Sequence, residues 1–117
     1  YQRRVRGMFQ LKCQQNGHYL QPETLDGEKI ILSDTERQIG HWKLHDNYIV
    51  NSMSNMVLSV NEQTKQLEQH PKKNFNSKQK WTFEEQKIVN TYWDLPIAFN
   101  NELMIGEENV LFFNKIQ

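Results

Sequence analysis

The chain has 117 residues, and its 14 Lys and Arg are balanced by 14 Asp and Glu, so the net charge is zero. A neutral chain lacks the basic surface that attracts polyanions, which argues against nucleic acid and against anionic membranes as partners. The single cysteine, Cys13, excludes an internal disulfide, and no apolar run approaches the ~20 residues of a membrane-spanning helix. Twelve Asn and 12 Gln make the chain polar, but six Phe, four Tyr and three Trp suffice for one small core.

The first residues differ in character from the rest of the chain. Arg3, Arg4 and Arg6 make this segment basic, and no apolar stretch follows, so it does not have the pattern of a signal peptide. We therefore predict that residues 1–7 are a linker or tail and that residues 8–117 form one domain.

Strand signals dominate from residue 9 onward. Short segments with alternating or mostly apolar residues are separated by polar turns such as Asp26-Gly27, whereas no segment keeps a helical apolar period beyond about two turns. The sequence therefore predicts an all-β protein with strands of about five residues and no helix longer than about one turn. In chain order, the segments are 9–13, 20–22, 30–32, 42–44, 48–52, 58–60, 81–83, 87–91, 97–99 and 111–113.

These segments repeat with a period of 39 residues. Trp42 recurs as Trp81, and the string Ile-Val-Asn occurs in 48–52 and again in 87–91. In a shortened third copy, Leu111 takes the position of the two tryptophans. The repeats are therefore about 8–46, 47–85 and 86–117.

Three such repeats predict a β-trefoil, with four strands in each repeat around a pseudo-three-fold axis. A four-stranded unit cannot bury its apolar face alone, so the three must share one core, and their closure leaves few free strand edges. A sandwich of two sheets would not explain the 39-residue period. The predicted inward residues are Leu11, Leu20, Trp42, Leu44, Val50, Leu58, Val60, Trp81, Phe83, Val89, Ile97, Phe99, Leu111 and Phe113.

The strings 42–52 and 78–83, each followed by a short apolar strand at 56–60 or 97–99, resemble the ricin B-type lectin domain. That family carries a Gln-x-Trp motif in each repeat, which here is intact as Gln79-Lys80-Trp81 and becomes Gly40-His41-Trp42 in the first repeat. The resemblance covers almost the whole chain. It implies a β-trefoil that binds sugars and favours an extracellular or secreted protein.

The resemblance also implies where a sugar would bind. Galactose-binding members use an Asp on the Leu-x-Val strand, an aromatic ring on the next hairpin and an Asn before the Gln-x-Trp motif. Here the Asp position holds Gln21, Ser59 and Ala98 in the three repeats. The second repeat comes nearest to the full set, so the candidate carbohydrate-binding residues are Ser59, Asn61, Glu62, His70 and Gln79, together with Trp93 of the third repeat.

Trp93 has two interpretations. It lies in a predicted turn, Tyr92-Trp93-Asp94, where aromatic residues are usually exposed, so it could stack on a sugar. Packing of its ring onto its own hairpin is the alternative.

Neither a catalytic centre nor a metal site is predicted, and no cofactor is expected. His41 and His45 are four residues apart, which on a strand separates them by about 13 Å, too far to share an ion. Cys13 ends the first strand at a position that Ser52 and Thr91 fill in the other repeats, so a packing role is expected. No known nucleophile motif occurs in the sequence.

Two functions remain open. The first is a non-catalytic carbohydrate-binding module, such as the targeting domain of a larger protein, whose partner is a glycan or glycoprotein. The second is a protein-interaction β-trefoil that has lost sugar binding, since one fold serves several functions. The intact Gln79-x-Trp81 motif favours the first, and the absence of the Asp in all repeats favours the second.

Overall fold

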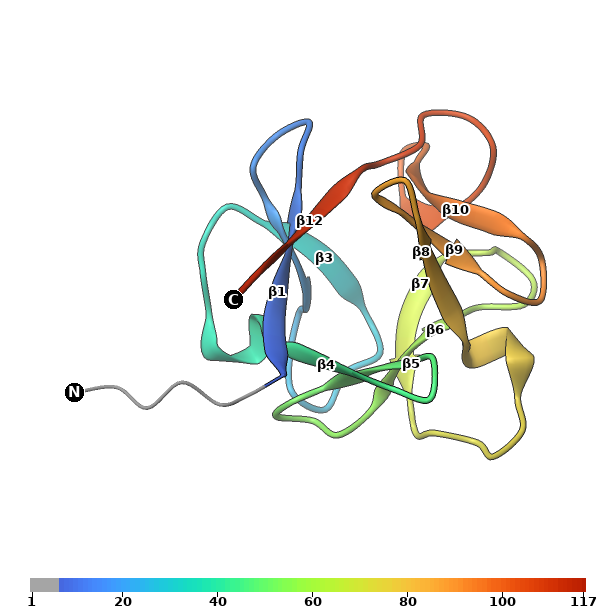
Figure 1. The fold of residues 1–117 in the computed structure, drawn as a ribbon, viewed down its shortest axis with the longest axis horizontal. Helices are drawn as coiled ribbons and strands as arrows, with labels where there is room; N and C mark the ends of the chain where they lie inside the picture. The colour runs from blue at the N-terminus through green and yellow to red at the C-terminus, as the bar shows by residue number, and fades with distance from the viewer. Residues whose placement is uncertain (1–6) are drawn as a thin grey trace.

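The computed structural model describes residues 7–117, in which twelve short strands and two single-turn 3-10 helices follow one another (Figure 1). The predicted linker, 1–7, lies outside the described residues except for Gly7. No helix among the described residues is long and apolar enough to cross a membrane. The elements are β1 (Met8–Cys13), β2 (Tyr19–Pro22), β3 (Ile30–Ser33), η1 (Gln38–Gly40), β4 (Trp42–His45), β5 (Tyr48–Asn51), β6 (Val57–Val60), β7 (Leu67–His70), η2 (Ser77–Gln79), β8 (Trp81–Glu84), β9 (Lys87–Asn90), β10 (Leu95–Phe99), β11 (Leu103–Ile105) and β12 (Phe113–Ile116).

Six strands form a central ring. Antiparallel ladders join β12 to β1, β1 to β4, β4 to β5 and β8 to β9. Single backbone hydrogen bonds complete the ring, from Trp81 to the Asn47 carbonyl (2.9 Å) and from Phe113 to the Gln86 carbonyl (2.8 Å). Figure 1 shows the last strand, β12, lying beside the first, β1. The remaining strands form three hairpins, β2–β3, β6–β7 and β10–β11, which is the arrangement of a β-trefoil.

The 39-residue period has a structural cause in the turn before each tryptophan. The Asn51 side chain donates to the carbonyl of Ile39 (2.7 Å), and the Asn90 side chain donates to the carbonyl of Lys78 (2.9 Å). Each Asn also accepts two backbone N–H groups of its own turn. Buried amides must be paired in this way, so the repeated Ile-Val-Asn string holds η1 and η2 in equivalent places.

The residues predicted to be equivalent, Trp42, Trp81 and Leu111, meet in one core cluster. The indole N–H of Trp42 donates to the Leu20 carbonyl (2.9 Å), and that of Trp81 donates to the Leu58 carbonyl (3.0 Å). In the third repeat the backbone N–H of Leu111 donates to the Ile97 carbonyl (3.0 Å) instead. The carbonyl at this position of the shortened repeat thus accepts a hydrogen bond although the repeat has no indole ring there.

Two of the predicted core residues are on the surface. Leu44 is 44% exposed and Phe99 is 47% exposed, so their placement in the core was wrong. Leu44 follows the pleat of Trp42, but it lies near the turn of the β4–β5 hairpin, beyond the end of the core. Phe99 is followed directly by the turn at 100–102, so it too lies at a hairpin end. Phe83 is half-buried against the core.

On β5 and β9, the residues predicted to face the main core are one position away from those that do. Val50 and Val89 are buried, but neither belongs to the main core cluster, and Val50 packs in a smaller cluster with Tyr48 and Val57. Ile49 and Ile88, both fully buried, fill the main core. Because neighbouring strand residues point to opposite faces, a doubly buried strand such as Tyr48–Asn51 gives no alternation from which to choose the inner face.

Candidate functional site

A cleft of about 420 Å³ opens between the β6–β7 hairpin and the loop that leads from β7 to η2. Five of the six candidate residues line it, and only Trp93 does not. The lining residues are Glu28, Ser59, Val60, Asn61, Glu62, Gln63, Glu68, His70, Pro71, Lys73, Asn76, Lys78 and Gln79. The cleft thus carries both hydrogen-bond donors and acceptors, and carboxylates as well as ammonium groups, but no aromatic carbon ring.

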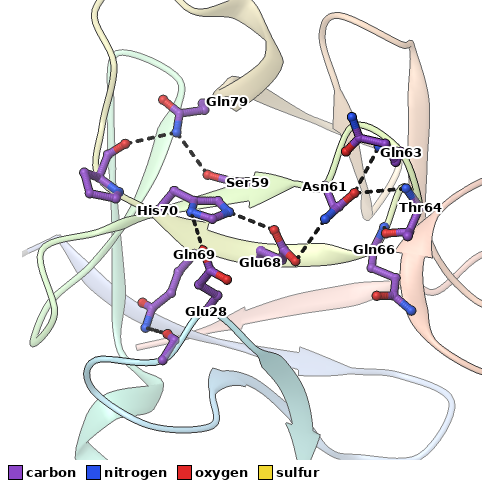
Figure 2. A network of polar contacts seen from close by, with 12 residues as sticks. Glu28, Ser59, Asn61, Gln63, Thr64, Gln66, Glu68, Gln69, His70 and Gln79 are labelled. Carbon is purple, nitrogen blue, oxygen red and sulfur yellow. Dashed lines mark hydrogen bonds and ion pairs between the residues drawn. The ribbon is translucent and has the colours of Figure 1, made fainter.

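The floor of the cleft contains Ser59 and Gln79, which face each other in Figure 2. Both are buried, and the Gln79 amide donates to the Ser59 hydroxyl (3.1 Å), which itself donates to the Val57 carbonyl (3.0 Å). The Ser59 hydroxyl is therefore already paired within the protein. Its role is to shape the floor, and the exposed groups around it are the ones that a ligand meets first.

Gln79 also holds one wall of the cleft. Its side-chain oxygen accepts the backbone N–H of Lys73 (2.9 Å), and its amide donates to the Pro71 carbonyl (3.1 Å). Tyr48 adds a hydrogen bond to the Lys73 carbonyl (2.7 Å). The Gln of the Gln-x-Trp motif thus fixes the 71–79 loop from beneath, since each bond satisfies a group that would otherwise be unpaired.

The opposite wall is the turn after β6. Asn61 accepts the backbone N–H groups of Gln63 and Thr64 (both 3.0 Å) and donates to Glu68 (3.4 Å). Figure 2 shows Asn61 and Glu68 pointing toward one another across the hairpin. Asn61 therefore sets the shape of this wall and positions the Glu68 carboxylate at the floor.

His70 lies between two carboxylates. Its Nε2 is 2.8 Å from Glu68, which is two residues earlier on the same face of β7, and its Nδ1 is 3.2 Å from Glu28 of the first repeat (Figure 2). Glu28 reaches this place because its carbonyl accepts the N–H of Gln69, whose buried side chain donates to carbonyls of the 24–27 turn. Sequence reasoning missed both carboxylates. The alternation of Glu68 and His70 was a usable signal, but nothing local indicated Glu28.

These three side chains are also the group that could hold a metal ion among residues 7–117. Their potential ligand atoms lie within 4.8 Å of one another. However, both nitrogens of the His70 ring are engaged by the two carboxylates, so an ion would have to separate His70 from a partner. The contacts of His70 link the first repeat to the second.

Glu62 and Lys78 join the two walls at the rim of the cleft, with 2.7 Å between Oε1 and Nζ. The hydrogen bond from Lys78 and its charge lower the pKa of Glu62 from its ordinary value of 4.5, and the bond to Glu62 raises the pKa of Lys78 above 10.5. Both side chains are open to water, so the contact contributes little to overall stability.

We expect this bridge to be visible in a pH titration of Glu62. Because its pKa is lowered in the folded state, the contribution of the bridge is present above pH ~4.5 and is lost as the pH falls through the lower, folded-state pKa. A carbon-detected NMR titration should give a midpoint for Glu62 below its ordinary value of 4.5. The Lys78→Gln variant should return the Glu62 midpoint to the ordinary range. An unchanged midpoint in that variant would contradict the bridge.

Trp93 lies outside the cleft and packs against the core. It is half-buried, with its ring edge-on to Tyr92 (centroids 4.8 Å apart), and the Lys65 ammonium lies 5.1 Å from its ring centre. These contacts agree with packing in its own turn.

The other two repeats lack an equivalent cleft floor. In the first, Gln21 is fully buried and pairs with Arg37 (2.7 Å) and the Thr35 carbonyl (3.0 Å). In the third, the corresponding Ala98 is apolar and fully buried. The polar groups that line the cleft therefore come mainly from the second repeat.

No family model and no curated protein matches this sequence. Solved structures do match over nearly the full chain. The Vibrio vulnificus hemolysin/cytolysin β-trefoil lectin, solved with N-acetyl-D-lactosamine, has a TM-score of 0.80 at 18% identity, covering 94% of this chain and 93% of that one. The chain has the β-trefoil fold. The C-half of the earthworm R-type lectin, solved with GalNAc, has a TM-score of 0.73 at 18% identity, covering 93% and 98%.

A third match is to part of an enzyme. An endo-β-galactosidase from Clostridium perfringens that releases GlcNAcα1-4Gal has a TM-score of 0.68 at 17% identity, covering 97% of this chain but 30% of that one. The predicted likeness to R-type lectins is thus confirmed for the fold. Identities this low show a common β-trefoil and leave the function to be argued from the cleft.

Proposed function

We propose that the chain is a non-catalytic carbohydrate-binding module with one working site, the cleft of the second repeat. The observation that carries this proposal is the convergence of Asn61, Glu62 and Glu68 on one open cleft, where they offer donors and acceptors at a common surface. Sugar hydroxyls are matched by such groups, and carboxylates bind pairs of hydroxyls in a bidentate manner. The sugar complexes of two proteins with the same fold support this interpretation.

The proposed affinity is low. The family position for a charged acceptor holds Ser59, whose hydroxyl is engaged by Gln79 and Val57. A charged hydrogen bond contributes roughly 1.5–3 kcal/mol against about 1 for a neutral one, so its loss weakens a site about tenfold. Glu68 compensates in part because it lies in the same cleft. We expect millimolar binding of a single sugar, which several copies on a larger assembly would strengthen.

A targeting role follows from the same site. A module that holds a sugar weakly and performs no chemistry on it serves to bring an attached domain to a glycosylated surface. In an endo-β-galactosidase of Clostridium perfringens, a part with this fold makes up 30% of a longer chain, which is the kind of arrangement that such a role requires. The alternative, a protein-interaction β-trefoil, is favoured by the exposed apolar side chains of Leu25, Met53 and Tyr92.

The test is a titration with GalNAc and with N-acetyl-D-lactosamine, each to tens of millimolar, followed by amide NMR shifts. We expect the shifts to cluster at 59–63, 68–70 and 71–79. Glu68→Gln should weaken binding about tenfold because it removes a charged acceptor from the cleft. The matched control is Glu107→Gln, which makes the same chemical change at an exposed position outside the cleft and should leave the affinity unchanged.

Other outcomes have definite meanings. Shifts that cluster around Trp93 and Asn100 would move the site to the third repeat. If neither sugar shifts any amide, and a glycan array at high protein concentration is also negative, the protein-interaction function takes precedence.

A further inference from the structure

A second cavity, of about 500 Å³, lies where the hairpins of the three repeats meet. This axial cavity has an apolar floor made of Ile30, Leu67 and Leu103, one residue from each repeat. The three hold equivalent places in the register of their hairpins, and all are buried. Polar side chains surround the floor, among them Gln66 and Glu102. The axial cavity therefore combines an apolar base with hydrogen-bonding groups at its rim.

In the part of the chain that the structure describes, the hairpins are joined at two of their three junctions. The Gln69 N–H donates to the Glu28 carbonyl (2.8 Å), and the Ile105 N–H donates to the Lys65 carbonyl (3.0 Å). Leu32 holds the equivalent place in the first hairpin, but among residues 7–117 no backbone hydrogen bond joins it to the third. The third hairpin, β10–β11, has the shortest turn of the three. It therefore leaves the space between the hairpins unfilled.

The axial cavity borders the cleft of the second repeat along β7. Gln66 lines the axial cavity, His70 lines the cleft, and Glu68 lines both. Figure 2 shows these residues following one another along β7, and strand spacing separates Gln66 from His70 by about 13 Å. Glu28 of the first hairpin also lines both hollows. The two hollows thus meet at a shared pair of carboxylates.

The size and chemistry of this combined surface suit a ligand longer than one sugar. A pyranose is a single ring built from bonds of about 1.5 Å, so it cannot reach from Gln66 to His70. The side chain of Glu28 is 65% exposed at the boundary. Carboxylates accept hydrogen bonds, and sugar hydroxyls donate them, so Glu28 and Glu68 can contact the rings on both sides of a glycosidic link. A ligand that fills both hollows has at least two linked rings.

We propose that the cleft and the axial cavity form one extended site for an oligosaccharide of at least two sugars. One sugar occupies the cleft, and the next one crosses Glu28 and Glu68 into the axial cavity. There, Gln66 and Glu102 bind its hydroxyls, while the apolar floor contacts the C–H groups of the ring. This inference rests on the proposed function and adds the class of ligand, a glycan chain in place of an isolated terminal sugar.

The test compares methyl α-D-galactoside, which has one ring, with N-acetyl-D-lactosamine, which has two, in amide NMR titrations of the wild-type protein. We expect both sugars to shift the cleft amides of 59–63. Only the disaccharide should also shift those of 29–30, 66–67 and 102–103, which line the axial cavity alone. We expect it to bind about tenfold more tightly than the single ring, because it gains the contacts of the second hollow.

Glu102→Gln removes a charged acceptor from the axial cavity and leaves the cleft intact. We expect this variant to weaken disaccharide binding about fivefold and to leave the affinity for the single ring unchanged, whereas Glu68→Gln should weaken both. Glu102 is exposed, so the midpoint of thermal unfolding should stay within about 2 °C. The matched control is Glu107→Gln, the same change at an exposed position outside both hollows.

Four results decide between the possibilities. A loss of disaccharide affinity in Glu102→Gln, with the single ring unaffected, supports the extended site. Equal affinities for the two sugars, with shifts confined to the cleft, overturn the extended site but keep the proposed function. A tighter disaccharide that binds Glu102→Gln as well as it binds Glu107→Gln, and that leaves 102–103 unshifted, also overturns it, because the second ring then lies elsewhere. Binding of neither sugar overturns the proposed function and this inference together.

Discussion

Replacing Trp81 with Ala should lower the free energy of unfolding by roughly 3–5 kcal/mol, the range for buried aromatic residues cut to Ala. The indole is 1% exposed, lies in the main core cluster, and donates to the Leu58 carbonyl. Its removal leaves a cavity and an unpaired buried carbonyl at once. Against a total of about 5–15 kcal/mol for a domain, this is a large share of the stability. Urea titrations would measure this loss in the free energy of unfolding, provided that its dependence on urea concentration is the same in the variant and the wild type.

Trp93→Ala is the control for that measurement. The sequence leaves two interpretations of Trp93 open, and if it were an exposed turn residue a loss under about 1 kcal/mol would be expected. The structure shows it half-buried against the core and edge-on to Tyr92, so a loss of roughly 1–2 kcal/mol is now expected. If Trp93→Ala costs as much as Trp81→Ala, the assignment of Trp81 as a principal core residue and Trp93 as a peripheral one is contradicted.

The second large effect concerns the first repeat, where a Gly replaces the Gln of the Gln-x-Trp motif. A Cβ at Gly40 would lie 2.7 Å from the Gln21 amide nitrogen and 3.1 Å from its Cγ. Gln21 is fully buried and held by Arg37, so it cannot move away freely. Gly40→Gln should therefore lower the free energy of unfolding by about 1–3 kcal/mol, the range for overpacked cores, measured by urea titration.

The second repeat provides the compensating change. There, Gln79 stands two residues before Trp81, and the small Ser59 stands on the strand. Each repeat therefore has one side-chain amide in this space, but in the first repeat it comes from the strand and in the second from the 3-10 turn. We expect the double variant Gln21→Ser with Gly40→Gln to recover at least half of the stability lost by Gly40→Gln. A double-mutant cycle with no favourable coupling would show that the two side chains do not share this space.

The reciprocal exchange at these positions also explains why one repeat keeps a cleft and the other does not. In the first repeat the amide belongs to the strand, and Arg37 covers it with hydrogen bonds to Gln21 and to the Pro22 and Glu23 carbonyls. In the second, the amide belongs to the 3-10 turn and anchors the 71–79 loop, whose side chains line the cleft. A buried side-chain amide is therefore present in both repeats, but it lies under a filled surface in the first and under an open cleft in the second.

The sequence by itself determined the fold. The 39-residue period, the repeated Ile-Val-Asn string and the two tryptophans specify local structures that depend on nearby residues, such as the hydrogen bonds from Asn51 and Asn90 to the turn twelve positions earlier. The sequence also placed the candidate site in the second repeat, because hairpin and loop residues that are close in the chain stay close in the fold. Five of its six candidates line one cleft for that reason.

Only the tertiary structure decided which polar groups face solvent and which are already paired. The sequence predicts Ser59 and Gln79 as ligand contacts, yet they are buried against each other, because a strand residue and a turn residue 20 positions apart meet beneath the cleft. Glu28 joins His70 across two repeats, which no local pattern records. The inner face of β5 was likewise predicted one residue off, with Val50 in place of Ile49, since a strand buried on both faces shows no alternation. Long-range contacts set all three, and their geometry depends on how the repeats close around a shared core.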